Sequence, residues 1–280
     1  LISNPKYYIV AVDNLSTGKL TNLPPPSSRW KFIKCDVNQK SDISQVMLSY
    51  QFDYVFHYAA VVGVKRTLIN PVNVLMDIEG IKNISNLSKN TGVKQVFYSS
   101  SSEIYGEPIE MPQNEYTTPL NSRLPYAVAK NVGEVYLKSY FQEFGLKYTI
   151  FRFFNTYGPK QSEDFVISKF INQALNNSDI TIYGNGKQTR TFCYIDDNIK
   201  TVVNILSKNL GINEIINVGN DNEISILELA RMIIELTKSK SRIIHLPPLP
   251  EGDMSRRLPN NSKMKKILGR KLTPLGVGLR

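Results

Sequence analysis

The sequence predicts an α/β fold built on a parallel β-sheet with helices on its faces. Short β-rich runs alternate with helical stretches through the first half of the chain, which is the pattern of repeated strand-helix-strand units. Small or polar residues follow each β-rich run, as expected where strands end in loops. After about residue 157, loops rich in Gly, Asn and Pro predict a smaller second lobe.

Five runs in the first half are predicted to be strands because β-branched and aromatic residues dominate them. They are 7–12 (YYIVAV), 30–35 (WKFIKC), 54–57 (YVFH), 95–98 (QVFY) and 147–153 (KYTIFRF). Apolar residues recur at helical spacing between them, which predicts helices over 71–90 and 127–144. The second lobe is predicted to hold helices over 164–177 and 225–237 and a strand over 180–183.

Polar or small residues mark the ends of all five predicted strands. In chain order they are Asp13, Asp36, Ala59 with Ala60, Ser99 to Ser102, and Asn155. Because ligands bind beyond the carboxyl ends of parallel strands, we expect these residues to form one site.

Composition indicates a globular chain, with 41% hydrophobic and 21% charged residues. The net charge of +10 is scattered, which favours solvated surface charge over nucleic-acid binding and also suits a diphosphate-bearing substrate. No apolar run reaches the roughly 18 residues of a membrane span and no leader opens the chain, so we expect a cytoplasmic protein. Two cysteines and two histidines make no zinc set, and both cysteines are expected to be buried in a reducing compartment.

Tyr126 and Lys130 form the strongest candidate for chemistry. The spacing of four residues places both side chains on one face of the predicted helix. An ammonium beside a phenol favours the phenolate, so Lys130 is expected to lower the pKa of Tyr126 and make it a base. An isolated match of this kind more often means a packed tyrosine and a solvated lysine. Here the serines at 99–102, whose hydroxyls could bind a substrate alcohol, follow a predicted strand nearby in the fold.

Asp13 and Asp36 admit two interpretations. A carboxylate at the end of the first strand can accept hydrogen bonds from the ribose of an adenosine cofactor. Asp13-Asn14 is equally typical of a turn, and Asp36-Val37 of a loop cap. The residues alone leave both interpretations open.

Five blocks together resemble the extended short-chain dehydrogenase/reductase family, and more narrowly its sugar-nucleotide epimerases and dehydratases. The blocks are Asp13-Asn14, His57-Tyr58-Ala59-Ala60, 99–106 (SSSSEIYG), Tyr126-x-x-x-Lys130 and 153–159 (FFNTYGP). The resemblance runs over nearly the whole chain. It implies a Rossmann-type doubly wound sheet that binds NAD over residues 1–156 and a substrate lobe over 157–280, with a segment near 190–220 returning to the first domain.

The resemblance also implies roles for individual residues. Tyr126 takes a proton from a sugar hydroxyl while hydride passes to the nicotinamide, Lys130 holds the nicotinamide ribose and Ser101 shares the hydroxyl. The catalytic set implied is Tyr126, Lys130, Ser101, Ser102 and Glu103. The cofactor set is Asp13, Asn14, Asp36, Val37, Tyr58, Ala59, Ala60, Val62, Asp77, Ser99, Tyr126, Lys130 and Phe153. Asn155 and Arg190 would bind the diphosphate of the substrate, to which an arginine guanidinium is well suited, and Tyr183 and Asp253 would border its nucleotide.

Some residues depart from the family pattern. We expect the N-terminal strand and its glycine-rich phosphate loop to be missing, which puts NAD affinity in doubt. Ser102 stands where the dehydratases have an acidic partner for Glu103, which disfavours 4,6-dehydration. Val62, Asp77 and Pro250 replace a Lys, an Asn and an Arg of the best-known epimerase, so the substrate need not be UDP-glucose.

The sequence therefore predicts an NAD-dependent 4-epimerase that oxidises a nucleotide sugar at C4 and reduces it again. A decarboxylase of the UDP-glucuronate type is the first alternative, because its members also carry Ser-Glu at 102–103. A dehydrogenase that releases the keto-sugar is another, and so is a chain that binds a nucleotide or a partner without catalysis. Relatives of this kind dimerise through two helices, here 71–90 and 127–144, so a homodimer is expected.

Overall fold

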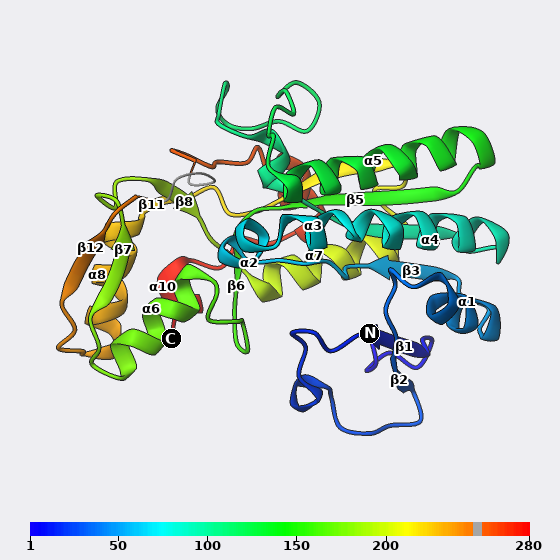
Figure 1. Ribbon diagram of the computed structural model, residues 1–280, viewed down its shortest axis with the longest axis horizontal. Helices are drawn as coiled ribbons and strands as arrows, with labels where there is room; N and C mark the ends of the chain where they lie inside the picture. Colours follow the sequence, from blue (N-terminus) through cyan, green and yellow to red (C-terminus); the bar gives the residue numbers. More distant parts are fainter. Residues whose placement is uncertain (249–253) are drawn as a thin grey trace.

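The computed structural model describes residues 1–248 and 254–280, except for the side chains of residues 64 and 65. Its centre is a four-stranded parallel sheet in the order β10-β5-β4-β3. The strands are β3 (Tyr54–His57), β4 (Gln95–Ser101), β5 (Lys147–Phe153) and β10 (Glu214–Val218). The predicted α/β class with a parallel sheet is confirmed (Figure 1).

Helices cover both faces of this sheet because alternate residues of its strands point in opposite directions. Val96 and Tyr98 of β4 pack with α1 (Lys40–Ser49), α4 (Asp77–Asn90) and α5 (Pro125–Phe144). Phe97, between them, packs on the other face. Its neighbours there come from α7 (Ile195–Lys208) and α9 (Ser262–Leu268). The arrangement is the doubly wound one that the resemblance implies.

The first two strands, β1 (Ile9–Asp13) and β2 (Trp30–Lys34), form a separate parallel pair. They do not bond to the main sheet, because within the described residues β1 bonds only to β2 and β3 only to β4. Both pieces still share a core, since Val10 and Ile33 pack against the same cluster as Val96. Figure 1 shows the pair beside the main body.

A second lobe packs around its own core. It contains α6 (Val166–Leu175), β7 (Ile180–Tyr183), α8 (Ile226–Thr237) and β12 (Ile243–Leu246). Ser225 caps α8 by a reciprocal pair of bonds with Glu228, which fixes the start of that helix. β10 and α7 belong to the main sheet instead, although the exact domain boundaries stay a prediction.

Several elements differ in extent from the sequence prediction. β4 runs on to Ser101, because its pairing with β5 continues from Ser99 opposite Phe151 to Ser101 opposite Phe153. The predicted helix over 71–90 is divided at Met76. The remaining elements are η1 (Leu20–Asn22), α2 (Val64–Ile69), α3 (Pro71–Leu75), η2 (Ser102–Tyr105), β6 (Thr156–Tyr157), β8 (Thr189–Thr191), β9 (Cys193–Tyr194), β11 (Glu223–Ser225) and α10 (Leu275–Gly278).

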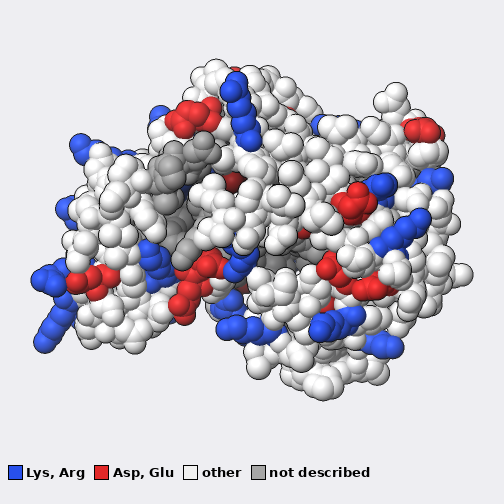
Figure 2. All heavy atoms as spheres, in the orientation of Figure 1, with Lys and Arg blue, Asp and Glu red and all other residues white. Residues whose placement is uncertain are grey.

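The surface is mixed in character. Figure 2 shows Lys and Arg interspersed with Asp and Glu on the face drawn. The helix α5 exposes Val128, Val135, Phe141 and Phe144, which would suit the expected dimer face, although the dimer stays a prediction. Both cysteines are buried and free, as expected. Within residues 1–248 and 254–280, no helix is long and apolar enough to cross a bilayer.

Candidate functional site

A pocket opens where β3 and β4 end, between the loop after β3 and the helices α4 and α5. It is lined by His57, Ala59, Ala60, Asp77, Ile81, Tyr98, Tyr126, Ala129 and Lys130. Residues from β3, β4, α4 and α5 thus meet here. The predicted site contributes five of the lining residues: Ala59, Ala60, Asp77, Tyr126 and Lys130. Ala59 and Ala60, with their short side chains, line the pocket together with Lys130.

Tyr126 lies in the first turn of α5 with Pro125 before it, a position that suits proline because its missing N–H has no partner there. The Ser101 hydroxyl, at the end of β4, lies close enough to its phenol to act on its pKa. Burial raises the pKa of Tyr126, and the charge of Glu103 adds to this, whereas the Ser101 hydroxyl and the charge of Arg257 oppose it.

Lys130 lies one turn further along α5, 4% exposed, with its Nζ 5.7 Å from the centre of the Tyr126 ring. The Nζ donates to the carbonyl oxygen of Ser99 at 2.7 Å and lies 3.4 Å from the Ser99 hydroxyl. Burial lowers the pKa of Lys130 to about 8, against the opposing effect of the Asp77 charge. The expectation that Lys130 lowers the pKa of Tyr126 is not met, because burial outweighs the charges around the phenol.

Asp77 fixes the loop that forms the opposite wall of the pocket. Its Oδ2 accepts a hydrogen bond from the backbone N–H of Val61 at 2.7 Å, and its side chain lies close to that of Asn38. Burial raises the pKa of Asp77 more than these neighbours and Lys130 lower it. An acidic residue here therefore holds the loop and faces the Lys130 ammonium.

His57 lies buried at the end of β3, stacked on Tyr98 with ring centres 5.8 Å apart. Burial lowers the pKa of His57 to about 3, and the charge of Lys130 contributes. The folded protein therefore keeps this histidine neutral at pH values where the unfolded chain, with a pKa of about 6.5, binds a proton.

Acidification from pH 6.5 to 5 is expected to lower the free energy of unfolding of the wild type by about 1.6 kcal/mol more than that of His57→Gln. The sign follows because only the unfolded histidine binds a proton in that window. Urea unfolding at both pH values measures the difference. His245→Gln removes an exposed histidine and is the control. Equal losses in wild type and His57→Gln would contradict a neutral buried His57.

Glu103 and Arg257 approach the same pocket from distant parts of the chain. Arg257 Nη1 lies 3.5 Å from Glu103 Oε1, and Arg257 is 5% exposed. Its Nε has no hydrogen-bond partner among the described residues. Ser102 is 2% exposed beside Glu103. No motif in the sequence pointed to Arg257, which is 154 positions from Glu103.

The remaining residues expected around the cofactor form two groups. At the ends of β1 and β2, Asn14 Nδ2 donates to Asp36 Oδ2 at 3.2 Å, and Asp13 accepts the N–H of Leu15 at 2.6 Å. The carbonyl oxygen of Val37 accepts a bond from Asn83 of α4. The turn interpretation of Asp13 is thus realised, while its carboxylate stays exposed and open to a ribose.

In the main sheet, the ring of Tyr58 meets that of Phe153 edge-on at 5.8 Å. Val62 lies in the same loop as Ala59 and Ala60, and its carbonyl oxygen accepts a bond from Arg66. The side chain of Ser99 lies near the Lys130 ammonium.

The predicted substrate residues are spread more widely. Asn155 Nδ2 lies 3.4 Å from the carbonyl oxygen of Thr191, the residue that follows Arg190 in the chain. Arg190 is 7% exposed, on β8. Tyr183 ends β7, is 39% exposed and lies under the ammonium of Lys169. Asp253 and Pro250 lie outside the described residues.

Comparison with known proteins identifies this arrangement. A model of the NAD dependent epimerase/dehydratase family matches residues 1–219. A UDP-N-acetyl-alpha-D-glucosaminuronate decarboxylase from Bacillus cytotoxicus is 32% identical over 92% of this chain and 83% of its own length. A UDP-glucose 4-epimerase with UDP-glucose from Thermotoga maritima is 30% identical, with a TM-score of 0.90 over 98% of this chain and 88% of that one.

A third relative carries both a uronic acid and a cofactor. The UDP-glucuronic acid 4-epimerase from Bacillus cereus in complex with UDP-glucuronic acid and NAD is 27% identical, with a TM-score of 0.88 over 100% of this chain and 90% of that one. The sequence and the fold of the chain are thus similar to one family of enzymes over nearly its whole length. The chain belongs to the NAD-dependent epimerase/dehydratase family.

Proposed function

We propose that this chain is a nucleotide-sugar 4-epimerase that oxidises C4 of the sugar to a ketone and then reduces it from the other face. One observation carries the proposal: the Tyr126 phenol is paired with the Ser101 hydroxyl in a pocket that also holds Lys130. A sugar hydroxyl that entered between Tyr126 and Ser101 would meet both a proton acceptor and a hydrogen-bond donor.

The residues of the pocket fit NAD, which supplies the acceptor for the hydride of C4. Ala59, Ala60 and Lys130 would hold its nicotinamide ribose, and Asp13 or Asp36 would accept bonds from its adenosine ribose. Asn155 and Arg190 would hold the substrate diphosphate. Tyr126 would take the hydroxyl proton at its Oη as the phenolate, which the positive charge of a bound oxidised nicotinamide beside Lys130 would favour against burial, and would return it after the sugar has turned over.

Elimination of water is the outcome that the site supports least. Dehydration needs an acid and a base beside the sugar, and the residue before Glu103 is Ser102, not a second carboxylate. A ketone formed here would therefore be reduced again rather than dehydrated.

The proposal predicts that the purified protein, with added NAD, converts nucleotide sugars whose sugar part carries no charge. UDP-glucose and UDP-N-acetylglucosamine are the substrates to supply, and NMR of the products distinguishes the C4 epimers, which have equal mass. Bound NAD, measured after denaturation, is expected in the same preparation. A protein that binds NAD or a nucleotide sugar but converts neither UDP-glucose nor UDP-N-acetylglucosamine would contradict the proposal and support a binding role without catalysis.

Decarboxylation of a uronic acid is a second candidate, and the Glu103–Arg257 contact favours it. A buried arginine whose Nε has no partner among the described residues, and whose charge acts on the Tyr126 phenol, is suited to a carboxylate at C6. A C4 ketone is β to that carboxyl group, so the ketone can accept the electron pair when carbon dioxide leaves. The sequence relative from Bacillus cytotoxicus is named for a reaction of this kind.

Arg257→Gln separates the two candidates. Loss of a charge-assisted bond to a carboxylate is expected to lower kcat/KM for UDP-glucuronate about 10- to 100-fold and to change that for UDP-glucose much less. Release of carbon dioxide from UDP-glucuronate by the wild type would establish decarboxylation. The exposed neighbour Arg256, changed to Gln, is the matched control. Equal effects on both sugars would argue against carboxylate binding by Arg257.

A further inference from the structure

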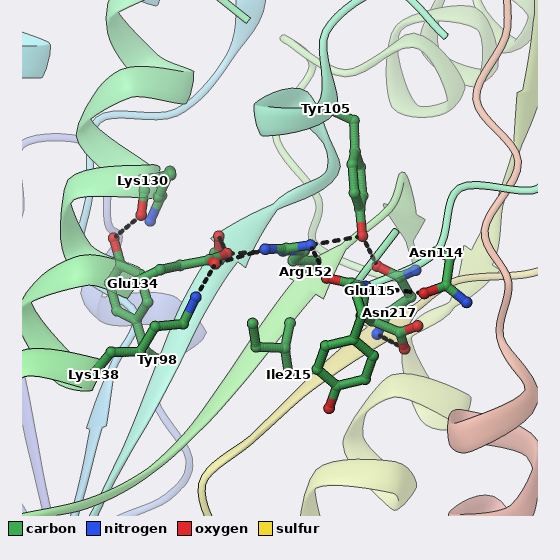
Figure 3. A network of polar contacts seen from close by, with 12 residues as sticks. Tyr98, Tyr105, Asn114, Glu115, Lys130, Glu134, Lys138, Arg152, Ile215 and Asn217 are labelled. Carbon is green, nitrogen blue, oxygen red and sulfur yellow. Dashed lines mark hydrogen bonds and ion pairs between the residues drawn. The ribbon is translucent and has the colours of Figure 1, made fainter. Parts of the chain in front are cut away.

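A buried ion pair lies directly behind the pocket. Glu134 of α5 is 0% exposed and Arg152 of β5 is 1% exposed. The guanidinium binds the carboxylate through two bonds, Nε to Oε1 at 2.9 Å and Nη2 to Oε2 at 2.7 Å. Figure 3 shows that the other end of Arg152 is also held, by the Tyr105 hydroxyl and the carbonyl oxygen of Glu115. The position of the Glu134 carboxylate is therefore fixed from several directions.

This carboxylate holds the strand segment that carries the proposed chemistry. The Ser100 hydroxyl donates to Glu134 Oε1 at 2.6 Å. Ser100 lies between Ser99, whose carbonyl oxygen accepts from Lys130, and Ser101, whose hydroxyl pairs with Tyr126. Glu134 itself follows Lys130 by one helical turn.

Three successive serines of β4 are thus tied to three successive turns of α5. Ser101 meets Tyr126, Ser99 meets Lys130 and Ser100 meets Glu134. Only the Glu134 contact is anchored independently of the pocket, through Arg152 on the neighbouring strand β5.

Apart from the Tyr98 hydroxyl, which donates to the Lys130 carbonyl oxygen at 3.4 Å, the remaining contacts between α5 and β4 are mainly apolar, as for Leu137 with Val96 and Tyr98 in the shared core. Apolar packing is non-directional, so it holds the helix against the sheet without fixing their register as sharply as a hydrogen bond does. A displacement of about 1 Å at reacting groups can cost orders of magnitude in rate.

We propose that Glu134, held by Arg152, is a positioning residue that acts through Ser100 to fix the end of β4 against Tyr126 and Lys130. The inference rests on the proposed function for its kinetic part. Its structural part, the placement of the Ser99 carbonyl oxygen on Lys130, can be measured without turnover.

Ser100→Ala tests the inference while keeping the ion pair intact, because Glu134 Oε1 still accepts from Arg152. The expected result is a fall in kcat of about tenfold with KM for the nucleotide sugar unchanged. The pKa of Lys130, followed by NMR of labelled lysine, is expected to fall below its wild-type value of about 8 by about half a unit, because the ammonium loses a well-placed acceptor.

Two further variants make the result decisive. Ser88→Ala removes a buried hydroxyl of α4 that has no partner among the described residues, and is expected to change neither quantity. Ser100→Thr keeps a hydroxyl and is expected to recover most of both. A Lys130 pKa that is the same in Ser100→Ala and in the wild type would overturn the inference. So would a Ser100→Ala variant that is less stable than the wild type and in which kcat and KM both fall.

Failure of the proposed function gives a different result. In that case the wild type shows no turnover of any sugar, while the Lys130 pKa still shifts in Ser100→Ala and not in Ser88→Ala.

Discussion

Tyr126→Phe is expected to lower turnover by at least about 10²-fold, the usual cost of removing an acid-base group. The substitution keeps the ring and removes only the hydroxyl that pairs with Ser101. Because phenylalanine can neither take nor return a proton, oxidation and re-reduction of the sugar should both slow, while KM for the nucleotide sugar stays near the wild-type value. Steady-state kinetics with the best wild-type substrate provide the measurement.

Tyr140→Phe is the matched control for this prediction. Tyr140 lies on the same helix, in a ring contact with Phe144 at the far end of α5 from the pocket. Its loss of a hydroxyl should leave turnover unchanged. If Tyr126→Phe retained full turnover, the proton would have to pass through another group, and the assignment of Tyr126 would fail.

Local pattern was sufficient for much of the fold. The bounds of β3, β5 and β7 match the prediction because β-branched and aromatic residues dominate each of them. The helix start at Ser225 was also predictable, since Ser and Glu at that spacing form a capping box.

Contacts between distant segments were not predictable in the same way. The serines 99–101 look like a polar turn, yet they extend β4 because β5 pairs with them, and only tertiary structure supplies that partner. Arg257 reaches Glu103 across 154 positions and carries no motif of its own. The division of the sheet between β1 and β3 likewise depends on which strands are available to pair, rather than on their own sequences.

The pKa of Tyr126 shows the same limit in electrostatics. Spacing on a helix places Lys130 on the face that carries Tyr126, and the structure does bring them within 5.7 Å. Spacing contains no information on burial, which raises the pKa of the phenol, or on Ser99, which binds the ammonium. The resemblance identified the participants, and the structure changes the account of how their charges act.

Arg152→Met is expected to lower the free energy of unfolding by about 3–5 kcal/mol, the range for breaking a buried ion pair. The cost arises because Glu134, fully buried, keeps its charge without the guanidinium, and its contact with Lys138 at 3.8 Å is a weak substitute. Urea unfolding of the purified variant measures it. The exposed pair of Arg256 and Glu223 offers a control, since Arg256→Met should cost no more than about 1 kcal/mol.

The double variant Arg152→Met with Glu134→Leu separates the charge from the packing. An apolar pair of similar volume should recover much of the lost stability, because no buried charge is left unpaired. The double variant should nevertheless keep the slow turnover expected of Ser100→Ala, since Ser100 has again lost its acceptor. Recovery of stability together with full activity would mean that the ion pair serves the fold alone; recovery of stability without activity would mean that this family member keeps a buried charge pair for the geometry of its pocket.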